Sequence, residues 1–266
     1  MVRALGVIPA RYASTRFPGK PLAPLGNGTV LGAVWSAAAA SRRLARVIVA
    51  TDDERIVDAC RTLGAESMMT SPEHPSGTDR TAEVARRAGH EFDVVLNIQG
   101  DEPFLTATAL DRLVGALDDR PECEAATLAE PLSDPDELFD PGAVKVVCAG
   151  DGRALYFSRA PIPYHRGTAQ PLRADFRGAL ASRPGGTAGY LKHQGIYAYR
   201  RETLFALTLL PPSPLEIDEG LEQLRALQAG IGMLVVDSDF RSIAVDTPAD
   251  LARAAARLGS RQEINR

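Results

Sequence analysis

The chain has 266 residues, of which 45% are hydrophobic and 24% are charged, and its formal net charge is −4 at pH 7. This composition is typical of a globular protein with a substantial core, and the acidic balance argues against a nucleic-acid partner, which usually needs a basic face. The first apolar run is too short for a signal peptide, and the alanine-rich run at 30–40 falls far short of the ~20 residues that a membrane span requires. We therefore expect a cytoplasmic protein with no membrane partner.

Strand-like and helix-like apolar patterns alternate through the first half of the chain. Strands are predicted at 4–8, 46–51, 66–69 and 92–98, and helices at 29–43, 52–63, 80–88 and 106–117. This alternation predicts parallel strands joined by right-handed crossovers. Ligands of such sheets bind beyond the carboxyl ends of the strands, where we expect 11–20, 76–80 and 99–102 to lie.

A loop with three cations, Arg11, Arg16 and Lys20, follows the first predicted strand. Small residues and prolines separate the cations, so backbone N–H groups can approach an anion, and the loop is a candidate phosphate site. The alternative is a solvated basic turn. The loop is not a Walker A motif, because Pro21 follows Lys20 in place of Ser or Thr, and no GxGxxG follows the strand.

The second half of the chain is more varied. Strands are predicted at 124–130, 143–149, 154–158, 193–199, 232–237 and 241–246, and helices at 201–209, 217–230 and 248–258. The second and third of these strands are expected to pair as a hairpin through a Gly-Asp-Gly turn. The segment 161–192 is rich in Gly, Pro and Arg, and is predicted to be a lid or an excursion toward a partner. No linker marks a boundary, so we expect one domain over 1–258 and a tail at 259–266.

Two aspartates stand at the ends of predicted strands. Asp101 follows Gly100 at the end of a buried strand, and Asp246 precedes the final helix. Carboxylates that face a phosphate loop hold Mg²⁺ through one or two protein oxygens together with substrate phosphates. For Asp246 the alternative is a helix N-cap.

Other polar residues have a structural alternative as well. The run SGTDR at 76–80 either contacts a base edge or only caps a helix, and the lone His193 is either a ligand-binding or a core histidine. Glu222 and Gln223 lie on a predicted amphipathic helix, where solvent exposure is the default interpretation. The separated Cys60, Cys123 and Cys148 give no sign of a disulfide or a zinc site, and we expect them to be buried.

Taken together, these motifs resemble those of the 3-deoxy-manno-octulosonate (Kdo) cytidylyltransferases. The matching segments, in family order, are PARYASTRFPGKPL at 9–22, SGTDR at 76–80, NIQGDEP at 97–103, AVKVV at 143–147, ALYFSR at 154–159, GIY at 195–197, LEQLR at 221–225 and VDTP at 245–248. Each motif alone is weak, but the set is specific and extends over nearly the whole chain.

The resemblance implies a Rossmann-like nucleotidyltransferase fold of the nucleotide-diphospho-sugar transferase type. This is an α/β/α sandwich around a mostly parallel mixed sheet, in which about 125–200 form the acceptor and dimer subregion. It also implies that CTP and Kdo react, with Mg²⁺ as cofactor, to give CMP-Kdo and pyrophosphate for lipopolysaccharide biosynthesis. The family is usually homodimeric, so a homodimer is expected.

The resemblance also assigns site residues, motif by motif. Lys20, Arg11 and Asp101 are expected to be catalytic, and Asp101 and Asp246 to bind the metal. The expected CTP contacts are Ala10, Arg11, Arg16, Lys20, Ser76, Gly77, Thr78 and Arg80. The expected acceptor contacts are Gln99, His193, Tyr197, Glu222 and Gln223.

The chain departs from the family pattern on the acceptor side. Gln194, Ile217 and Gly220 replace the usual residues, and 164–192 is longer than expected. The alternative is therefore the same CTP chemistry on another acceptor, such as 8-amino-Kdo, a sialic acid or a small phosphonate. A second alternative, a non-catalytic nucleotide-binding module, is disfavoured because Lys20, Asp101 and Asp246 are all present.

Overall fold

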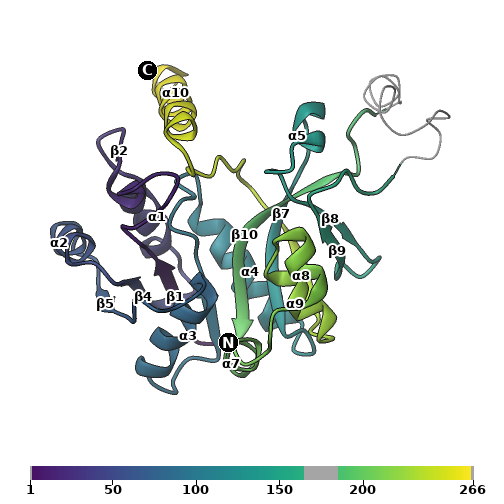
Figure 1. Cartoon of the computed structure of the whole chain (residues 1–266), viewed down its shortest axis with the longest axis horizontal. Helices are drawn as coiled ribbons and strands as arrows, with labels where there is room; N and C mark the ends of the chain where they lie inside the picture. The colour runs from purple at the N-terminus through teal and green to yellow at the C-terminus, as the bar shows by residue number, and fades with distance from the viewer. Residues whose placement is uncertain (1, 165–184, 265–266) are drawn as a thin grey trace.

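The computed structural model describes residues 2–164 and 185–264, and a central sheet with helices on both faces dominates them (Figure 1). The strands of this sheet are β1 (Ala4–Pro9), β4 (Leu44–Thr51), β5 (Ser67–Met69), β6 (Val94–Asn97), β7 (Ala125–Pro131), β8 (Lys145–Cys148), β9 (Ala154–Ser158), β10 (Leu191–Arg200) and β11 (Met233–Asp237). The short strands β2 (Pro24–Leu25) and β3 (Gly28–Thr29) form a separate ribbon.

The helices connect these strands. They are the 3-10 turn η1 (Lys20–Leu22), α1 (Val30–Ala39), α2 (Glu54–Leu63), α3 (Gly77–Arg87), α4 (Ala107–Asp119), α5 (Pro135–Phe139), α7 (Arg201–Leu207), α8 (Pro214–Glu219), α9 (Gln223–Gln228) and α10 (Pro248–Ile264). Hydroxyl and carboxylate side chains cap the first helices, including Thr29 for α1, Asp53 for α2 and Thr106 for α4. No helix in the described part of the chain combines the length and apolarity needed to cross a membrane.

The main sheet has the order β11-β7-β10-β6-β1-β4-β5, and β8 joins β10 and carries β9. The strands β5, β4, β1 and β6 are parallel, β10 runs antiparallel to both β6 and β7, and β11 is parallel to β7. The prediction of a mixed, mostly parallel sheet is confirmed, as is the antiparallel hairpin of β8 and β9. The central strands β1 and β6 are apolar and buried on both faces, as parallel strands covered by helices must be.

Side chains of β1 point alternately into two apolar layers. Ala4 and Ile8 pack with α1, α4 and α10 on one face, whereas Leu5 and Val7 pack with α3, α7 and α9 on the other. Cys60 and Cys123 are buried in the first layer, Cys148 packs against the second, and all three are free thiols. This arrangement is the predicted α/β/α sandwich.

Two helix predictions in the chain need correction. The helix predicted over 29–43 ends at Ala39, because Asp111 of α4 accepts hydrogen bonds from the backbone N–H groups of Arg42 and Arg43. The single helix predicted over 217–230 is two helices, since Gly220 adopts a left-handed conformation with φ of 61° and ends α8 before α9 begins.

Further corrections concern the C-terminal part. Residues 241–246 are extended but do not join the sheet; Ser242 N instead donates to the Glu130 carboxylate and Val245 N to the Asp101 carbonyl. The final helix continues to Ile264 and does not end near 258. Most of the predicted lid at 161–192 lies outside the described residues.

Candidate functional site

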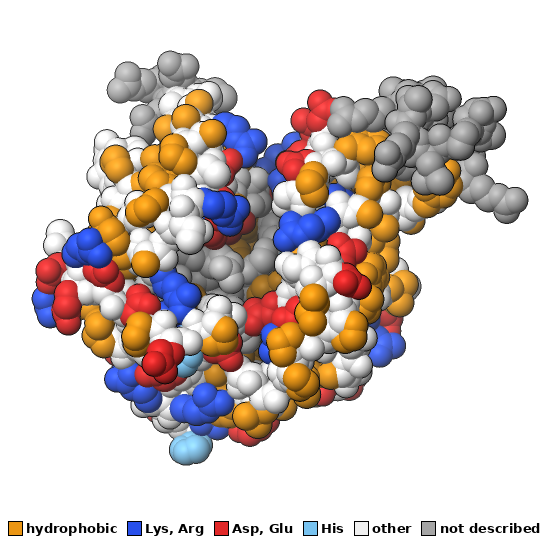
Figure 2. Space-filling view, in the orientation of Figure 1, with side chains coloured by type: hydrophobic (Ala, Val, Ile, Leu, Met, Phe, Trp, Pro, Cys, Tyr) orange, Lys and Arg blue, Asp and Glu red, His pale blue; other side chains and the backbone are white. Residues whose placement is uncertain are grey.

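Three loops meet at the carboxyl edge of the parallel strands. They enclose a cavity of about 420 Å³ that is lined by some of the residues in 9–21, 75–80 and 99–101. Figure 2 shows a hollow between the two halves of the molecule, with charged side chains at its rim. Because β1, β4 and β6 are parallel and adjacent, the segments that follow them must emerge at this one edge.

The shape of the first loop depends on Gly19 and Tyr12. Gly19 has a φ of 74°, its N–H donates to the Tyr12 carbonyl at 2.9 Å, and a Cβ at this position would lie 3.2 Å from the Tyr12 ring. Arg55 of α2 stacks its guanidinium on the other side of the loop, against the same Tyr12 ring. The loop is therefore closed on itself, and Lys20 begins the turn η1 directly after it.

An ion cluster around Lys20 lies at the cavity, whose lining includes Lys20 and Asp101. The Lys20 ammonium lies 2.6 Å from Asp101 Oδ2 and 3.0 Å from Asp246 Oδ1. Burial by itself lowers the pKa of Lys20, but the two carboxylates outweigh it and raise the pKa above its ordinary value. Lys20 therefore remains a cation, and both carboxylates converge on one positively charged position.

Asp246 belongs to this cluster and does not cap the final helix. Its second oxygen, Oδ2, lies 3.2 Å from Arg16 Nη2, whose side chain is 66% exposed. At the start of α10 the capping hydrogen bonds join Thr247 and Asp250. The Asp101 carbonyl holds the extended segment before Asp246 through Val245 N, which brings the two strand-end regions together.

Arg11 and Arg80 share one carboxylate, Asp52. Arg80 is fully buried, with Nη2 2.8 Å from Asp52 Oδ2, while Arg11 Nε lies 3.9 Å from the same oxygen. Arg11 also donates to the His74 carbonyl, and Arg80 to the Thr70 hydroxyl. Both arginines line the cavity and tie the loop 70–76 to the edge of the sheet. Asp52 was not among the predicted site residues, although it directly follows a predicted strand.

Of the other predicted nucleotide contacts, Ala10, Ser76 and Gly77 line the same cavity and Thr78 does not, while Gln99, predicted to contact the acceptor, also lines it. Ser76 caps α3, because its Oγ accepts from Asp79 N and donates to the Asp79 carboxylate. Gly77 faces Pro9, and Ala10 and Gln99 line the cavity. Ser76 thus fulfils the capping alternative, and it lines the cavity as well.

The predicted acceptor residues on β10 form a buried group. His193 Nε2 lies 3.0 Å from Thr127 Oγ1, and its ring is 5.5 Å from that of Tyr197. Burial lowers the pKa of His193 to about 3, so the imidazole is neutral at ordinary pH. Burial, reinforced by the charge of Glu222, raises the pKa of Tyr197. Gln194, one of the departures, is buried and donates to the Phe240 carbonyl.

Glu222 and Gln223 begin α9. Gln223 is only 5% exposed, and its Nε2 has no partner among the described residues, so the prediction of a solvated surface position is wrong for it. Glu222 is half-buried, and its Oε2 accepts a hydrogen bond from Thr78 Oγ1 at 2.8 Å. A second cavity, of about 600 Å³, borders Glu222 and shares Pro75 and Ser76 with the first.

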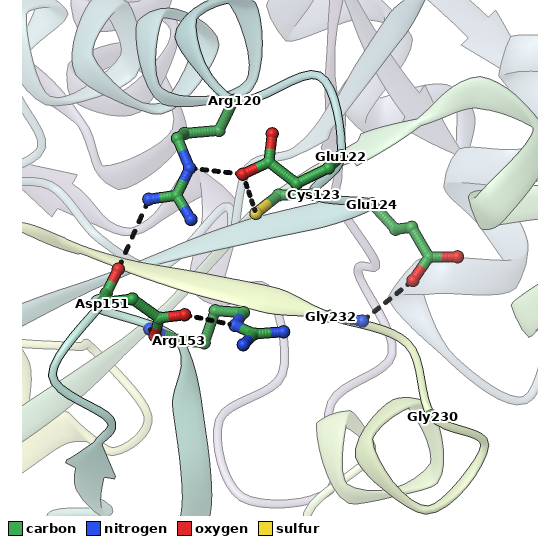
Figure 3. A pocket seen from close by; sticks show the side chains of 8 residues that line it. All are labelled: Arg120, Glu122, Cys123, Glu124, Asp151, Arg153, Gly230 and Gly232. Atoms are coloured by element: carbon green, nitrogen blue, oxygen red, sulfur yellow. Dashed lines mark hydrogen bonds and ion pairs between the residues drawn. The ribbon is translucent and has the colours of Figure 1, made fainter.

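A third cavity, of about 250 Å³, lies at the opposite edge of the sheet, where β7 and β11 begin (Figure 3). Its charges are paired locally: Arg120 bonds to Glu122, and Arg153 bonds to Asp151 at 2.7 Å. The described residues contain no group of three or more His, Cys, Asp or Glu side chains placed to hold a metal. Because the arginines of the third cavity pair with neighbouring carboxylates, the cavity at the carboxyl edge is the candidate active site.

Comparisons with known proteins agree with this geometry. A family model described as Cytidylyltransferase matches residues 5–238. The 3-deoxy-manno-octulosonate cytidylyltransferase of Methylococcus capsulatus is 48% identical over 96% of both chains, and that of Solibacter usitatus is 44% identical over 95% of this chain and 93% of its own. The chain belongs to the 3-deoxy-manno-octulosonate cytidylyltransferase family.

A solved structure of a family member shows the same architecture. It is a CMP:2-keto-3-deoxy-manno-octonic acid synthetase complexed with CTP, which is 39% identical to this chain. The two superpose with a TM-score of 0.84, over 97% of this chain and 99% of the other. The family resemblance and the nucleotidyltransferase fold predicted from the motifs are confirmed.

Proposed function

We propose that the chain transfers CMP from CTP to the anomeric hydroxyl of 3-deoxy-D-manno-octulosonate, which yields CMP-Kdo and pyrophosphate for lipopolysaccharide biosynthesis. The observation that carries this proposal is the convergence of Lys20, Asp101 and Asp246 at the carboxyl edge of the sheet, within a chain that matches its relatives over nearly their full length. Three loop cations near this cluster suit a triphosphate, whose charge calls for several donors at once.

In the proposed reaction the acceptor hydroxyl attacks the α-phosphorus in line, and pyrophosphate leaves from the opposite side. Catalysis of such a step is mainly positioning and neutralisation of charge. Lys20, Arg11 and Arg16 are placed to hold the triphosphate, and the backbone of Ser76 and Gly77 borders the position proposed for the cytidine. No protein nucleophile is needed.

Asp101 and Asp246 fit a divalent cation, which we propose to be Mg²⁺. Both already direct an oxygen toward one positive charge, that of Lys20, at 2.6 and 3.0 Å. Two carboxylates together with substrate phosphates are a common donor set for this ion. When bound, it would lower the pKa of the attacking hydroxyl and stabilise charge on the leaving group. Lys20 would then be released from the carboxylates and free to contact the triphosphate.

The acceptor side is proposed to involve Gln99 and the residues of β10 and α9. The buried Nε2 of Gln223, which has no partner in the part of the chain that the structure describes, is a donor suited to a hydroxyl or carboxylate oxygen of a sugar acid. His193 and Tyr197 are neutral and lie side by side, so their polar ring atoms can contact the sugar acid without adding a charge. A homodimer formed through about 125–200 is a further proposal that rests on the family resemblance. One domain over 1–258 and a cytoplasmic site of action are proposals that rest on the sequence pattern.

The test is pyrophosphate release from CTP with a panel of acceptors. We expect the highest kcat/KM with Kdo, compared with 8-amino-Kdo, a sialic acid and a small phosphonate. Turnover with one of these acids and none with Kdo would overturn the proposed acceptor. Failure to release pyrophosphate with every acceptor tested would favour a non-catalytic nucleotide-binding module.

A further inference from the structure

The hydroxyl of Thr78 joins three elements of the fold. Thr78 lies in the first turn of α3 and is 2% exposed. Its Oγ1 donates to Glu222 Oε2 at 2.8 Å and accepts from Asn97 Nδ2 at 3.2 Å. Asn97 ends β6, and Glu222 stands directly before α9, so one hydroxyl connects the nucleotide half of the sheet with the helix proposed to bind the acceptor.

The hydrogen bonds around Thr78 have a defined direction. A carboxylate can only accept, so the Thr78 proton points to Glu222, and the Thr78 lone pair is left for the Asn97 amide. Arg225, a cation near Glu222, bonds instead to Glu216, with its Nε 2.7 Å from Glu216 Oε2. Thr78 is therefore the hydrogen-bond donor that holds the Glu222 carboxylate in place among the described residues.

We propose that Thr78, supported by Asn97, is a positioning residue that orients Glu222 toward the acceptor. This proposal rests on the proposed function, in which Glu222 contacts the sugar acid. It differs from the family resemblance, which places Thr78 at the nucleotide. In the structure Thr78 does not line the cavity of the triphosphate loop, and its hydroxyl bonds to Glu222, directly before α9.

The test is the isosteric variant Thr78→Val, measured by steady-state kinetics with CTP and Kdo each varied in turn. Loss of a hydrogen bond to a charged group predicts that the KM for the acceptor rises about tenfold, while the KM for CTP changes little. Thr78→Ser keeps the hydroxyl and should restore most of the acceptor affinity. A thermal melt of each variant shows whether it is folded.

Thr81→Val is the matched control. Thr81 lies on the same helix, is fully buried, and donates only to the Gly77 carbonyl of its own helix at 2.8 Å. The substitution therefore has the same chemistry and a similar effect on packing, but it leaves Glu222 untouched. We expect near wild-type KM values for both substrates in this variant.

A double-mutant cycle with Glu222→Gln separates the possible outcomes. If Thr78 acts through Glu222, Thr78→Val should raise the acceptor KM by less than about twofold in the Glu222→Gln background. A raised KM for CTP in Thr78→Val, or an undiminished acceptor effect in the double variant, would overturn the positioning role. If Glu222→Gln alone leaves the acceptor KM unchanged, the proposed acceptor site itself is wrong, and the role of Thr78 falls with it.

Discussion

Replacing Asp101 by Asn is expected to lower the rate of CMP transfer by about three orders of magnitude, which corresponds to about 4 kcal/mol of barrier. The side chain keeps its size, but it loses the charge that lies 2.6 Å from Lys20 and that is proposed to hold the divalent cation. The measurement is pyrophosphate release at saturating CTP and Kdo over a range of Mg²⁺ concentrations.

Glu102→Gln is a matched control for this change, because it makes the same acid-to-amide substitution one residue away. Glu102 is buried, and its two carboxyl oxygens lie 2.6 and 2.7 Å from the Ser242 hydroxyl. We expect this variant to keep most of its activity. An Asp101→Asn enzyme that turns over within a few-fold of the wild type would exclude Asp101 as a metal ligand.

Replacing Lys20 by Met is expected to reduce kcat/KM for CTP by about a thousandfold, since it removes a cation that is proposed to hold the triphosphate. It also leaves Asp101 and Asp246 facing each other without the ammonium that lies within 3.0 Å of both. Calorimetric titration with CTP and steady-state kinetics measure the loss, and a thermal melt detects any effect of the unpaired carboxylates on stability.

Arg16→Met gives a graded comparison for Lys20. Arg16 is 66% exposed and contacts only one of the two carboxylates, so its removal should cost about tenfold or less. Equal losses in the two variants would contradict the central place of Lys20. A Lys20→Met enzyme with unchanged affinity for CTP would contradict the assignment of the loop as a triphosphate site.

The sequence predicts well which loops lie together at the carboxyl edge of the sheet. It does not predict the side-chain contacts between these loops. Apolar runs that end at 8, 51 and 98 locate the strands, and parallel topology then places the following loops together. Lys20 and Asp246 are 226 residues apart, and periodicity contains no information on such a pair. Both residues lie in motifs that resemble one family, and this resemblance predicts a common site. Only the fold shows that Lys20 lies between the two carboxylates.

The predictions are wrong where tertiary contacts override the local sequence pattern. The run 217–230 is amphipathic, yet Gly220 allows a left-handed turn that splits it and places Gln223 in the interior. The run 241–246 has strand-like composition, yet its N–H groups bond to Glu130 and to the Asp101 carbonyl instead of a neighbouring strand. Asp52 is not a predicted site residue, because its partners Arg11 and Arg80 come from other segments of the chain.

In the proposed function, Asp101 and Asp246 hold the divalent cation and Lys20 then contacts the triphosphate. The most direct test is anomalous X-ray scattering from crystals grown with CTP and Mn²⁺ in place of Mg²⁺. We expect a manganese peak between the carboxylate oxygens of Asp101 and Asp246, with the Lys20 ammonium on the phosphates. Manganese bound elsewhere, with Lys20 still between the two carboxylates, would contradict it.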